Sequence, residues 1–529
     1  MPKLLQQIFL DTARQSPDSP AIIHKKEIWS YGQLYNLVIE QAHAFQALNL
    51  KPNQRVAIYL PKQIETVTSF FAVTQAGGVF VPVNPVLKAP QILHTLLDCS
   101  VQILVTAKSR LQGLTEYLSN CPDLHTIILV DVTSCHKLDL ENIRFIGWQD
   151  YIALANQNNE LPEKIDADMA AILYTSGSTG KPKGIILSHQ NIVAGAKSVS
   201  EYLNITENDR LLAVLPFSFD YGLNQLTSTL LNGACCVLLD YLLPQDVITT
   251  LAHQKITGLA AVPPLWAQLA QMEWPDSINR YLRYMTNSGG KMPLPVLKKI
   301  RQKVPEADFF LMYGLTEAFR STYLPPNQLD KRPNSIGKAI PNAEIMVVRK
   351  NGSLCAPHEP GELVHRGSLV TMGYWNDPIK TAQHFKPAPA QLKGLPIPEI
   401  AVWSGDTVTM DKDGYLYFVG RKDNMIKTSG YRVSQTEIEE VAYASGLIKE
   451  AAAIGIEHDT LGQAILLTVS VETEQDFDKQ NLLKLCKTKL PNYMVPAKIE
   501  ILPSLPKNPN GKIDRTLLAQ QFAEIFGSA

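Results

Sequence analysis

Short apolar runs alternate with helix-period segments along the first two thirds of the chain. The segments 64–76 and 91–98 repeat their apolar residues with the spacing of an amphipathic helix. The apolar runs that we interpret as buried strands lie at 55–60, 101–105, 126–130, 211–215, 234–239 and 257–262. Alternating strands and helices of this kind predict an α/β fold.

The pattern changes beyond residue 340. Strands punctuated by turns predict a β-rich subdomain over about 340–420, and the proline-rich segment 385–398 predicts a surface loop within it. The last hundred or so residues again mix helices and strands. Helical periodicity at 434–445 and 479–490, with apolar runs at 451–456 and 464–471, predicts a compact α+β domain.

Composition narrows the class of protein. The 529 residues carry 49 Lys and Arg against 50 Asp and Glu, so the net charge of -1 supplies no field for nucleic acid or an anionic membrane. The seven cysteines form no C-x-x-C pair, which argues against a zinc cage. No apolar run approaches the roughly 18 residues of a membrane span, and the N-terminus lacks a signal-peptide core. We therefore expect a cytoplasmic protein.

The segment 174–184, Tyr-Thr-Ser-Gly-Ser-Thr-Gly-Lys-Pro-Lys-Gly, follows an apolar run at 169–173 that predicts a buried strand. Its glycines let the backbone approach an anion, and its hydroxyls and lysines can bind phosphate oxygens. A Walker A loop is excluded, because Pro182 follows Lys181 where Ser or Thr should ligate magnesium. The candidate phosphate ligands are Thr175, Ser176, Gly177, Ser178, Thr179, Gly180 and Lys183.

This loop closely resembles the signature loop of the adenylate-forming superfamily, which includes acyl-CoA synthetases, the adenylation domains of nonribosomal peptide synthesis, and luciferases. Further motifs match in the order of the family: Tyr-Gly-Leu-Thr-Glu at 313–317, Trp-Ser-Gly-Asp at 403–406, Gly-Arg-Lys-Asp at 420–423, Gly-Tyr-Arg-Val at 430–433 and Pro-Asn-Gly-Lys-Ile-Asp at 509–514. Ordered motifs over nearly the whole chain are far more specific than any one of them.

The resemblance implies two domains. A large N-terminal adenylate-forming domain of several subdomains would span residues 1–422, and a mobile α+β domain would span 423–529. Asp423 matches the residue about which the small domain of the family swings between two active states. On local grounds, Asp423 could equally cap the segment that follows it.

The resemblance also implies a reaction in two steps. A carboxylate attacks the α-phosphorus of ATP, giving an acyl-adenylate and pyrophosphate, and a thiol then attacks the adenylate to give a thioester and AMP. Catalysis of the first step requires positioning and charge neutralisation rather than a covalent nucleophile.

The family's roles carry over to matching positions of this chain. Lys512 is expected to reach both the attacking carboxylate and the α-phosphate. Glu317 is expected to ligate Mg²⁺, which prefers oxygen ligands, and Thr316 to contact phosphate. Asp406 is expected to accept the ribose hydroxyls with Arg421 beside it. The remaining nucleotide-site candidates are Gly289, Gly290, Tyr313 and Phe418. Lys427 and the turn 430–432 are expected to face the nucleotide in the thioester-forming state.

Members of the family differ from one another in the residues of the substrate pocket. In this chain, Phe219-Asp220 is similar to the Phe-Asp of amino-acid adenylation domains. A carboxylate in an apolar pocket requires a cationic partner, because burying it unpaired is costly. That partner is either the ammonium of the substrate or Arg320, which falls near the pocket by resemblance. Further lining candidates are Tyr221, Asn224, Ala261, Ser288 and Met312.

These pocket residues imply a small or compact cyclic side chain. We expect adenylation of a small amino acid, with L-proline favoured, and transfer to the phosphopantetheine thiol of a separate carrier protein. The alternative is an AMP-forming acyl-CoA ligase that acts on a simple carboxylic acid with coenzyme A.

Overall fold

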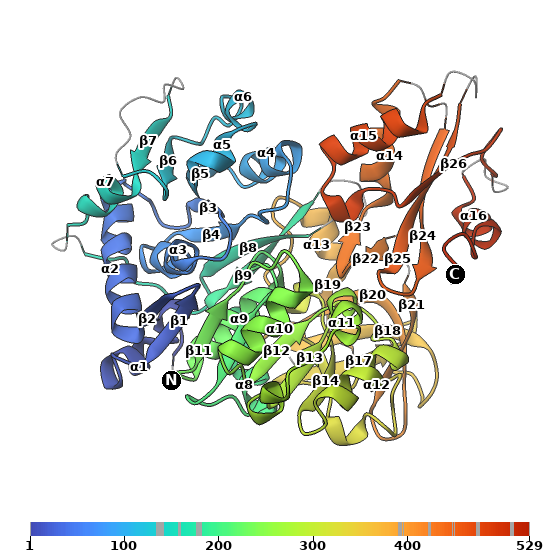
Figure 1. Ribbon diagram of the computed structural model, residues 1–529, viewed down its shortest axis with the longest axis horizontal. Helices are drawn as coiled ribbons and strands as arrows, with labels where there is room; N and C mark the ends of the chain where they lie inside the picture. Colours follow the sequence, from blue (N-terminus) through green and yellow to red (C-terminus); the bar gives the residue numbers. More distant parts are fainter. Residues whose placement is uncertain are drawn as a thin grey trace.

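The computed structural model describes residues 2–133, 142–156, 160–175, 182–389, 394, 396–421, 425–446, 448, 450–471, 477–507 and 513–527. The chain forms a large, layered α/β domain and a small domain at its C-terminal end (Figure 1). The mixed α/β class predicted from the sequence is confirmed. Within the described part of the chain, no helix combines the length and apolar character that crossing a membrane requires.

One sheet of the large domain supplies most of the residues that we discuss below. Its strands are β1 (Pro20–His24), β2 (Glu27–Ser30), β10 (Arg210–Ala213), β11 (Cys235–Leu238), β12 (Gly258–Ala261), β13 (Tyr284–Asn287), β14 (Asp308–Tyr313), β15 (Thr322–Leu324) and β16 (Lys338–Ala339). Their order is β16-β15-β14-β13-β12-β10-β11-β1-β2. The strands from β14 to β1 along this order run parallel, so their carboxyl ends meet at one edge, where ligands of open α/β sheets bind.

A second sheet lies beside the first. Its strands are β3 (Arg55–Tyr59), β4 (Val79–Pro82), β5 (Val101–Thr106), β6 (Thr126–Leu129), β7 (Arg144–Gly147), β8 (Met169–Thr175) and β9 (Lys183–Ser188), in the order β7-β6-β5-β3-β4-β8-β9. The strand predicted at 169–173 is β8. It pairs antiparallel with β9, and Thr175 lies opposite Lys183 in the register.

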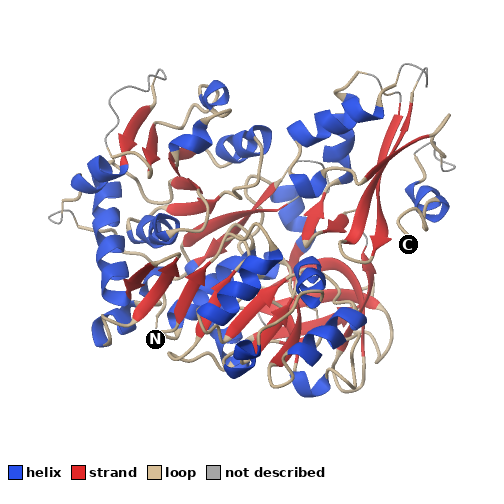
Figure 2. Ribbon diagram, viewed as in Figure 1, coloured by secondary structure: helices blue, strands red, loops and turns tan. Residues whose placement is uncertain are grey.

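Helices cover and separate these sheets (Figure 2). Those of the large domain are α1 (Leu10–Gln15), α2 (Tyr31–Ala47), α3 (Ile64–Gln75), α4 (Ala89–Asp98), α5 (Lys108–Leu111), α6 (Thr115–Leu118), α7 (Trp148–Ala153), α8 (His189–Leu203), α9 (Asp220–Leu231), α10 (Pro244–His253), α11 (Pro263–Ala270), α12 (Leu294–Lys303) and α13 (Pro378–His384). Ser188 caps α8 by accepting a hydrogen bond from the backbone of Asn191. Helix α9 is buried along nearly its whole length, which fixes the residues at its start.

The predicted β-rich segment forms a sheet of its own. Its strands are β17 (Ala343–Val348), β18 (Gly361–Gly367), β19 (Phe385–Pro387), β20 (Ile400–Met410) and β21 (Leu416–Arg421). Their order is β17-β18-β20-β19, with β21 also on β20. The expected surface loop at 385–398 is wrong at its start, because 385–387 pairs with β20 as an edge strand, where prolines are tolerated.

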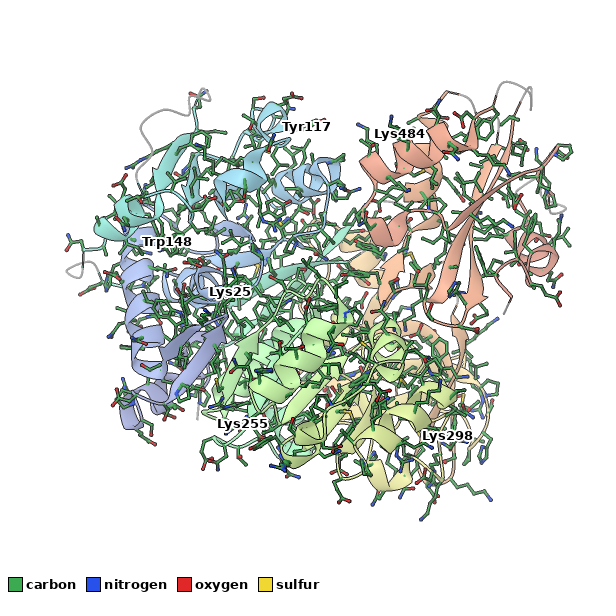
Figure 3. The ribbon with its side chains drawn as sticks, viewed as in Figure 1. Lys25, Tyr117, Trp148, Lys255, Lys298 and Lys484 are labelled. Atoms are coloured by element: carbon green, nitrogen blue, oxygen red, sulfur yellow. The ribbon has the colours of Figure 1, made fainter. Side chains whose placement is uncertain are left out.

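The small domain has its own sheet and core. Its elements are β22 (Ile426–Thr428), β23 (Tyr431–Val433), α14 (Gln435–Tyr443), β24 (Glu450–His458), β25 (Gly462–Ser470), α15 (Lys479–Lys489), β26 (Lys498–Ile501) and α16 (Arg515–Gln521). Helices α14 and α15 bury Ile438 and Leu482 in one apolar cluster with Leu467 of β25. Figure 3 shows Lys484 of α15 on this domain, far from Lys255 and Lys298 of the large one.

The two domains touch near the phosphate-loop hairpin. Gln91 of α4 donates hydrogen bonds to Glu437 Oε1 of α14 (3.1 Å) and to the Lys489 carbonyl (3.2 Å). In Figure 1, β23 and α13 lie near this contact. The docking brings the turn before β23 to the large domain.

Candidate active site

The β8–β9 hairpin carries the candidate phosphate loop between its strands. Thr175 ends β8 and Lys183 begins β9, while Ser176, Gly177, Ser178, Thr179 and Gly180 lie outside the described residues. Lys183 Nζ donates to Asp377 Oδ2 at 3.1 Å. Asp377 also caps α13, since its Oδ1 accepts the backbone N–H of Lys380 at 2.9 Å. The Asp377 carboxylate therefore links the β8–β9 hairpin to α13.

Glu317 lies on a short 3₁₀ turn that follows β14. Its side chain is 9% exposed, and its Oε1 accepts a hydrogen bond from Tyr374 Oη at 2.7 Å. Burial and the adjacent carboxylate raise the pKa of Tyr374, so its phenol remains a donor at neutral pH. The backbone carbonyl of Glu317 accepts from both the N–H and the hydroxyl of Thr371. With Thr316 beside it, Glu317 presents fixed oxygen atoms next to the hairpin.

Two predicted nucleotide-site residues meet at the end of β14. Tyr313 Oη donates to Asp406 Oδ2, and Asp406 is 1% exposed. The backbone N–H of Asp406 donates to Ser404 Oγ at 3.0 Å, which fixes the acidic residue on β20. The β20–β21 register pairs Asp406 with Arg421, whose side chain lies outside what the structure describes. Phe418, on the same strand as Arg421, is 45% exposed.

Asp220 and Arg320 form a buried but loose ion pair. Their side chains are 4% and 3% exposed, and Asp220 Oδ2 lies 3.9 Å from Arg320 Nη1. Burial raises the pKa of Asp220, and Arg320 offsets only part of this effect. Asp220 Oδ1 accepts the N–H of Tyr221 at 2.7 Å. Arg320 Nε and Nη2 have no hydrogen-bond partner among the described residues, so this pair can still bind a further polar group.

A cavity of about 20 Å³ lies among α8, α9 and the sheet, and Asp220 and Arg320 do not line it. Tyr221, Asn224 and Met312, three of the predicted lining residues, contribute to its wall. Ala260 lines this cavity and Ala261 does not, because successive strand residues point to opposite faces. Ser288 is buried next to β13 but does not line this cavity.

Polar atoms of the cavity wall lack partners. Asn224 Nδ2, Gln225 Oε1 and Tyr284 Oη are buried without a hydrogen bond in the described structure. The other wall residues are mostly apolar, and include Val199, Leu203, Ile205 and Leu211. The wall is therefore apolar with a few polar groups, around a space of about 20 Å³, which is the size of a water site.

The turn that precedes β23 reaches the large domain beside these residues. Gly430 has φ +80°, and a Cβ added to it would come 2.9 Å from Val262 Cγ1. A Cβ on Gly289, at φ +78°, would lie 3.7 Å from the Gly430 carbonyl oxygen. Gly290 follows, and a Cβ there would meet Pro263 at 2.9 Å. These glycines allow two backbones from different domains to approach closely.

Some residues predicted from the sequence cannot be placed, and some neighbours were not foreseen. Lys512 and Asp423 lie outside the described residues. The residues missed are Tyr374, Asp377 and Lys380, which surround Glu317 and Lys183. An aspartate followed by proline at the start of α13 is a helix N-cap signal, and it could have identified Asp377.

Comparisons with known proteins show the family to which the chain belongs. A family sequence model described as "AMP-binding enzyme" matches residues 9–375, and one described as "AMP-binding enzyme C-terminal domain" matches 437–512. Gramicidin S synthase 2 from Brevibacillus brevis is 28% identical over 98% of this chain and 11% of its own length. The chain thus spans about a tenth of the length of that curated relative.

One solved enzyme is similar in two states. A double mutant of o-succinylbenzoate CoA synthetase from Bacillus subtilis, bound with its product analogue OSB-NCoA, superposes with a TM-score of 0.82 at 26% identity over 97% of each chain. The same enzyme in complex with the acyl-adenylate intermediate OSB-AMP gives a TM-score of 0.67 at 25% identity, again over 97% of each chain. The fold of the present chain therefore matches the first of these two states more closely.

Proposed function

The chain belongs to the AMP-binding enzyme family and is an AMP-forming ligase of the adenylate-forming superfamily, and from this premise we propose that it activates a small amino acid. L-proline is the first candidate. The proposed product of the first step is the aminoacyl-adenylate, with release of pyrophosphate. The second step transfers the amino acid to the phosphopantetheine thiol of a separate carrier protein and releases AMP. The chain is related both to nonribosomal peptide adenylation domains and to acyl-CoA synthetases.

The Asp220–Arg320 pair carries the proposal of an amino acid. At 3.9 Å the pair is too long for a hydrogen bond, and burial still raises the pKa of Asp220. An ammonium group beside Asp220 would complete the charge compensation that Arg320 supplies only in part. The unpartnered nitrogens of Arg320 would donate to a carboxylate oxygen of the same molecule. A zwitterionic amino acid matches both needs at once.

The wall of the cavity bears on the choice of amino acid. A volume of about 20 Å³ exceeds the roughly 10–15 Å³ that one water requires, so any side chain that enters must move the wall residues. Asn224 Nδ2 and Tyr284 Oη lack hydrogen-bond partners, so a small hydroxylated side chain would pair with them better than an apolar one. L-serine therefore belongs in the same substrate panel as L-proline.

ATP is the proposed cosubstrate, with Mg²⁺. Thr175 and Lys183 would bind phosphate oxygens, and Asp406 would accept the ribose hydroxyls beside Tyr313. Glu317 would supply a carboxylate oxygen of the kind that suits Mg²⁺, and Thr316 would contact phosphate. The ion, when bound, would neutralise phosphate charge. Among the chain's own residues, Tyr374 fixes the orientation of the Glu317 carboxylate.

The docked turn supports a thiol-transfer step. Gly430 lies against Val262, and the chain superposes better on the enzyme with a product analogue than on the one with an acyl-adenylate. We infer that this orientation of the small domain serves the second step, and that Lys512 serves the first. A cytoplasmic location is proposed because thiol acceptors stay reduced there.

A second candidate is an AMP-forming acyl-CoA ligase for a simple carboxylic acid. The observation in its favour is that Arg320 lies close enough to neutralise Asp220 without any substrate. Asp220 would then be structural, and coenzyme A would replace the carrier protein as the thiol acceptor.

Carboxylate-dependent ATP–pyrophosphate exchange tests the proposal. The panel comprises L-proline, L-alanine, L-serine and the deaminated acids of the same shape. Exchange that depends on an amino acid supports the proposal. Exchange confined to the deaminated acids, followed by thioester formation with coenzyme A, would replace it with the second candidate.

A further inference from the structure

Lys380, which no family motif highlighted, lies among the charged residues of the site. It follows the start of α13, and its Nζ lies 5.2 Å from the centre of the Tyr374 ring. Asp377 also links Lys380 to Lys183, since one of its carboxylate oxygens accepts the Lys380 backbone N–H and the other accepts Lys183 Nζ. Since Tyr374 donates to Glu317, Lys380 stands between the hairpin and the candidate magnesium ligand.

Lys183 and Lys380 lie beside one carboxylate, Asp377, which forms an ion pair with the first of them. Asp377 Oδ2 is taken by Lys183, and within the described part of the chain Lys380 forms no ion pair with a carboxylate. Arg432 of the small domain contributes a further positive charge near Lys380, and Glu317 is the acidic group that opposes it. Placing amines together at a half-buried position is unfavourable unless an anion joins them.

The charges around Lys380 also affect its pKa. Burial, followed by the neighbouring Lys183 and Arg432, lowers the pKa of Lys380 to about 8, although Glu317 acts in the opposite direction. An anion bound between the amines would remove this repulsion and keep both charged. An anion that reaches both amines needs several charged oxygens, because Lys183 lies on β9 and Lys380 on α13.

We propose that Lys380 binds the pyrophosphate end of ATP, and the pyrophosphate product, together with Lys183. This inference rests on the proposed adenylation reaction and adds a positioning residue to it. Lys183 approaches the site from the hairpin and Lys380 from α13, so the two amines can hold different oxygens of one phosphate chain.

A purely structural role would rest on the cation–π contact with Tyr374. The chain offers a matched control, because Lys386 Nζ lies 5.1 Å from the centre of the Trp403 ring. Lys386 makes a comparable contact with an aromatic ring, but it lies on β19. It pairs with none of the described phosphate-site residues. Truncating both lysines separates the loss of a ring contact from the loss of an anion ligand.

The test compares Lys380→Met, Lys380→Arg and Lys386→Met in the full chain. Steady-state exchange gives KM for pyrophosphate and ATP, and calorimetry measures the binding of inorganic pyrophosphate. We expect Lys380→Met to raise both KM values about 10- to 100-fold, as for loss of one charged hydrogen bond, without changing KM for the carboxylate. Lys380→Arg should restore most of the affinity, and Lys386→Met should behave as the parent.

Two results would overturn the inference. Unchanged pyrophosphate affinity in Lys380→Met would show that the amine does not bind it, and an increase confined to KM for the thiol would assign Lys380 to the second substrate. Thermal unfolding of each variant identifies a folding defect, in which case Lys380→Gln, which is polar but uncharged, takes the place of Lys380→Met in the comparison. If the parent protein binds pyrophosphate but shows no ATP–pyrophosphate exchange with any carboxylate, the proposed function fails while the Lys380 site stands.

Discussion

Gly430 of the small domain lies in contact with Val262 of the large domain, so closely that a Cβ on Gly430 would come 2.9 Å from Val262 Cγ1. Real Cβ atoms do not approach so near, and Val262 is held at the start of α11. Any side chain at residue 430 must therefore displace the turn. The contact makes the docked orientation sensitive to a single methyl group.

Gly430→Ala should accordingly impair thiol transfer and spare adenylation. Alanine at φ +80° adds backbone strain to the clash with Val262. We expect thioester formation to fall at least about tenfold, as for a change of about 1.4 kcal/mol in the docking equilibrium, with pyrophosphate exchange nearly unchanged.

Gly446→Ala is the control for strain alone. Gly446 has φ +69°, but a Cβ there meets nothing within 4 Å. Its thioester activity should match that of the parent. Equal losses of exchange and thioester formation in Gly430→Ala would contradict a role confined to the second step.

Lys512→Ala should show the opposite pattern. If Lys512 stabilises the charge that develops at the α-phosphate, its loss should slow adenylate formation on the order of 10²- to 10³-fold. Transfer from a chemically prepared adenylate to the thiol should continue. Single-turnover measurements of each step separate the two. A comparable loss in both steps would argue against two working orientations.

Glu437 should make the docking of the domains depend on pH. Burial in the interface raises the pKa of Glu437 to about 7, although Gln91 donates a hydrogen bond to it and acts in the opposite direction. Because the docked state holds the proton more tightly than the free carboxyl, docking is favoured at low pH. It weakens as pH rises from the ordinary carboxyl pKa toward about 7.

Glu437→Gln should remove this dependence, because an amide does not ionise. The measurement is the ratio of thioester formation to pyrophosphate exchange between pH 5 and pH 8, roughly the window set by the ordinary and the raised carboxyl pKa. This ratio should decline with pH in the parent and stay level in the variant. A parallel decline in both proteins would mean that another group titrates.

Local patterns predicted the elements well, because short buried strands and amphipathic helices are visible in sequence. The strand before the phosphate loop is β8, and the helix expected at 434–445 is α14 (Gln435–Tyr443). The cavity wall could not be predicted in the same way. Ala260 lines the cavity and Ala261 does not, and only the register of the sheet decides which of the two faces it.

Two features depended on tertiary packing. Lys380 reaches the hairpin because Asp377 ties α13 to Lys183, and no spacing along the chain encodes that contact. The same sequence can pack its small domain in more than one orientation, so the sequence motifs alone did not predict the orientation found in the structure. The contact of Gly430 with Val262 became visible only in the folded chain.

The central claim is that Asp220 binds the ammonium group of an amino acid, and the sharpest test compares substrates in the parent and in Asp220→Ala. The measurement is kcat/KM in pyrophosphate exchange for L-proline and for cyclopentanecarboxylate, which has the same ring size without the amine. We predict that the parent prefers L-proline and that the variant loses this preference by about 10²- to 10³-fold, since truncating one partner of a buried ion pair costs roughly 3–5 kcal/mol. An unchanged preference, accompanied by a lower thermal midpoint, would contradict the claim, because Asp220 would then pair with Arg320 and serve an acyl-CoA ligase.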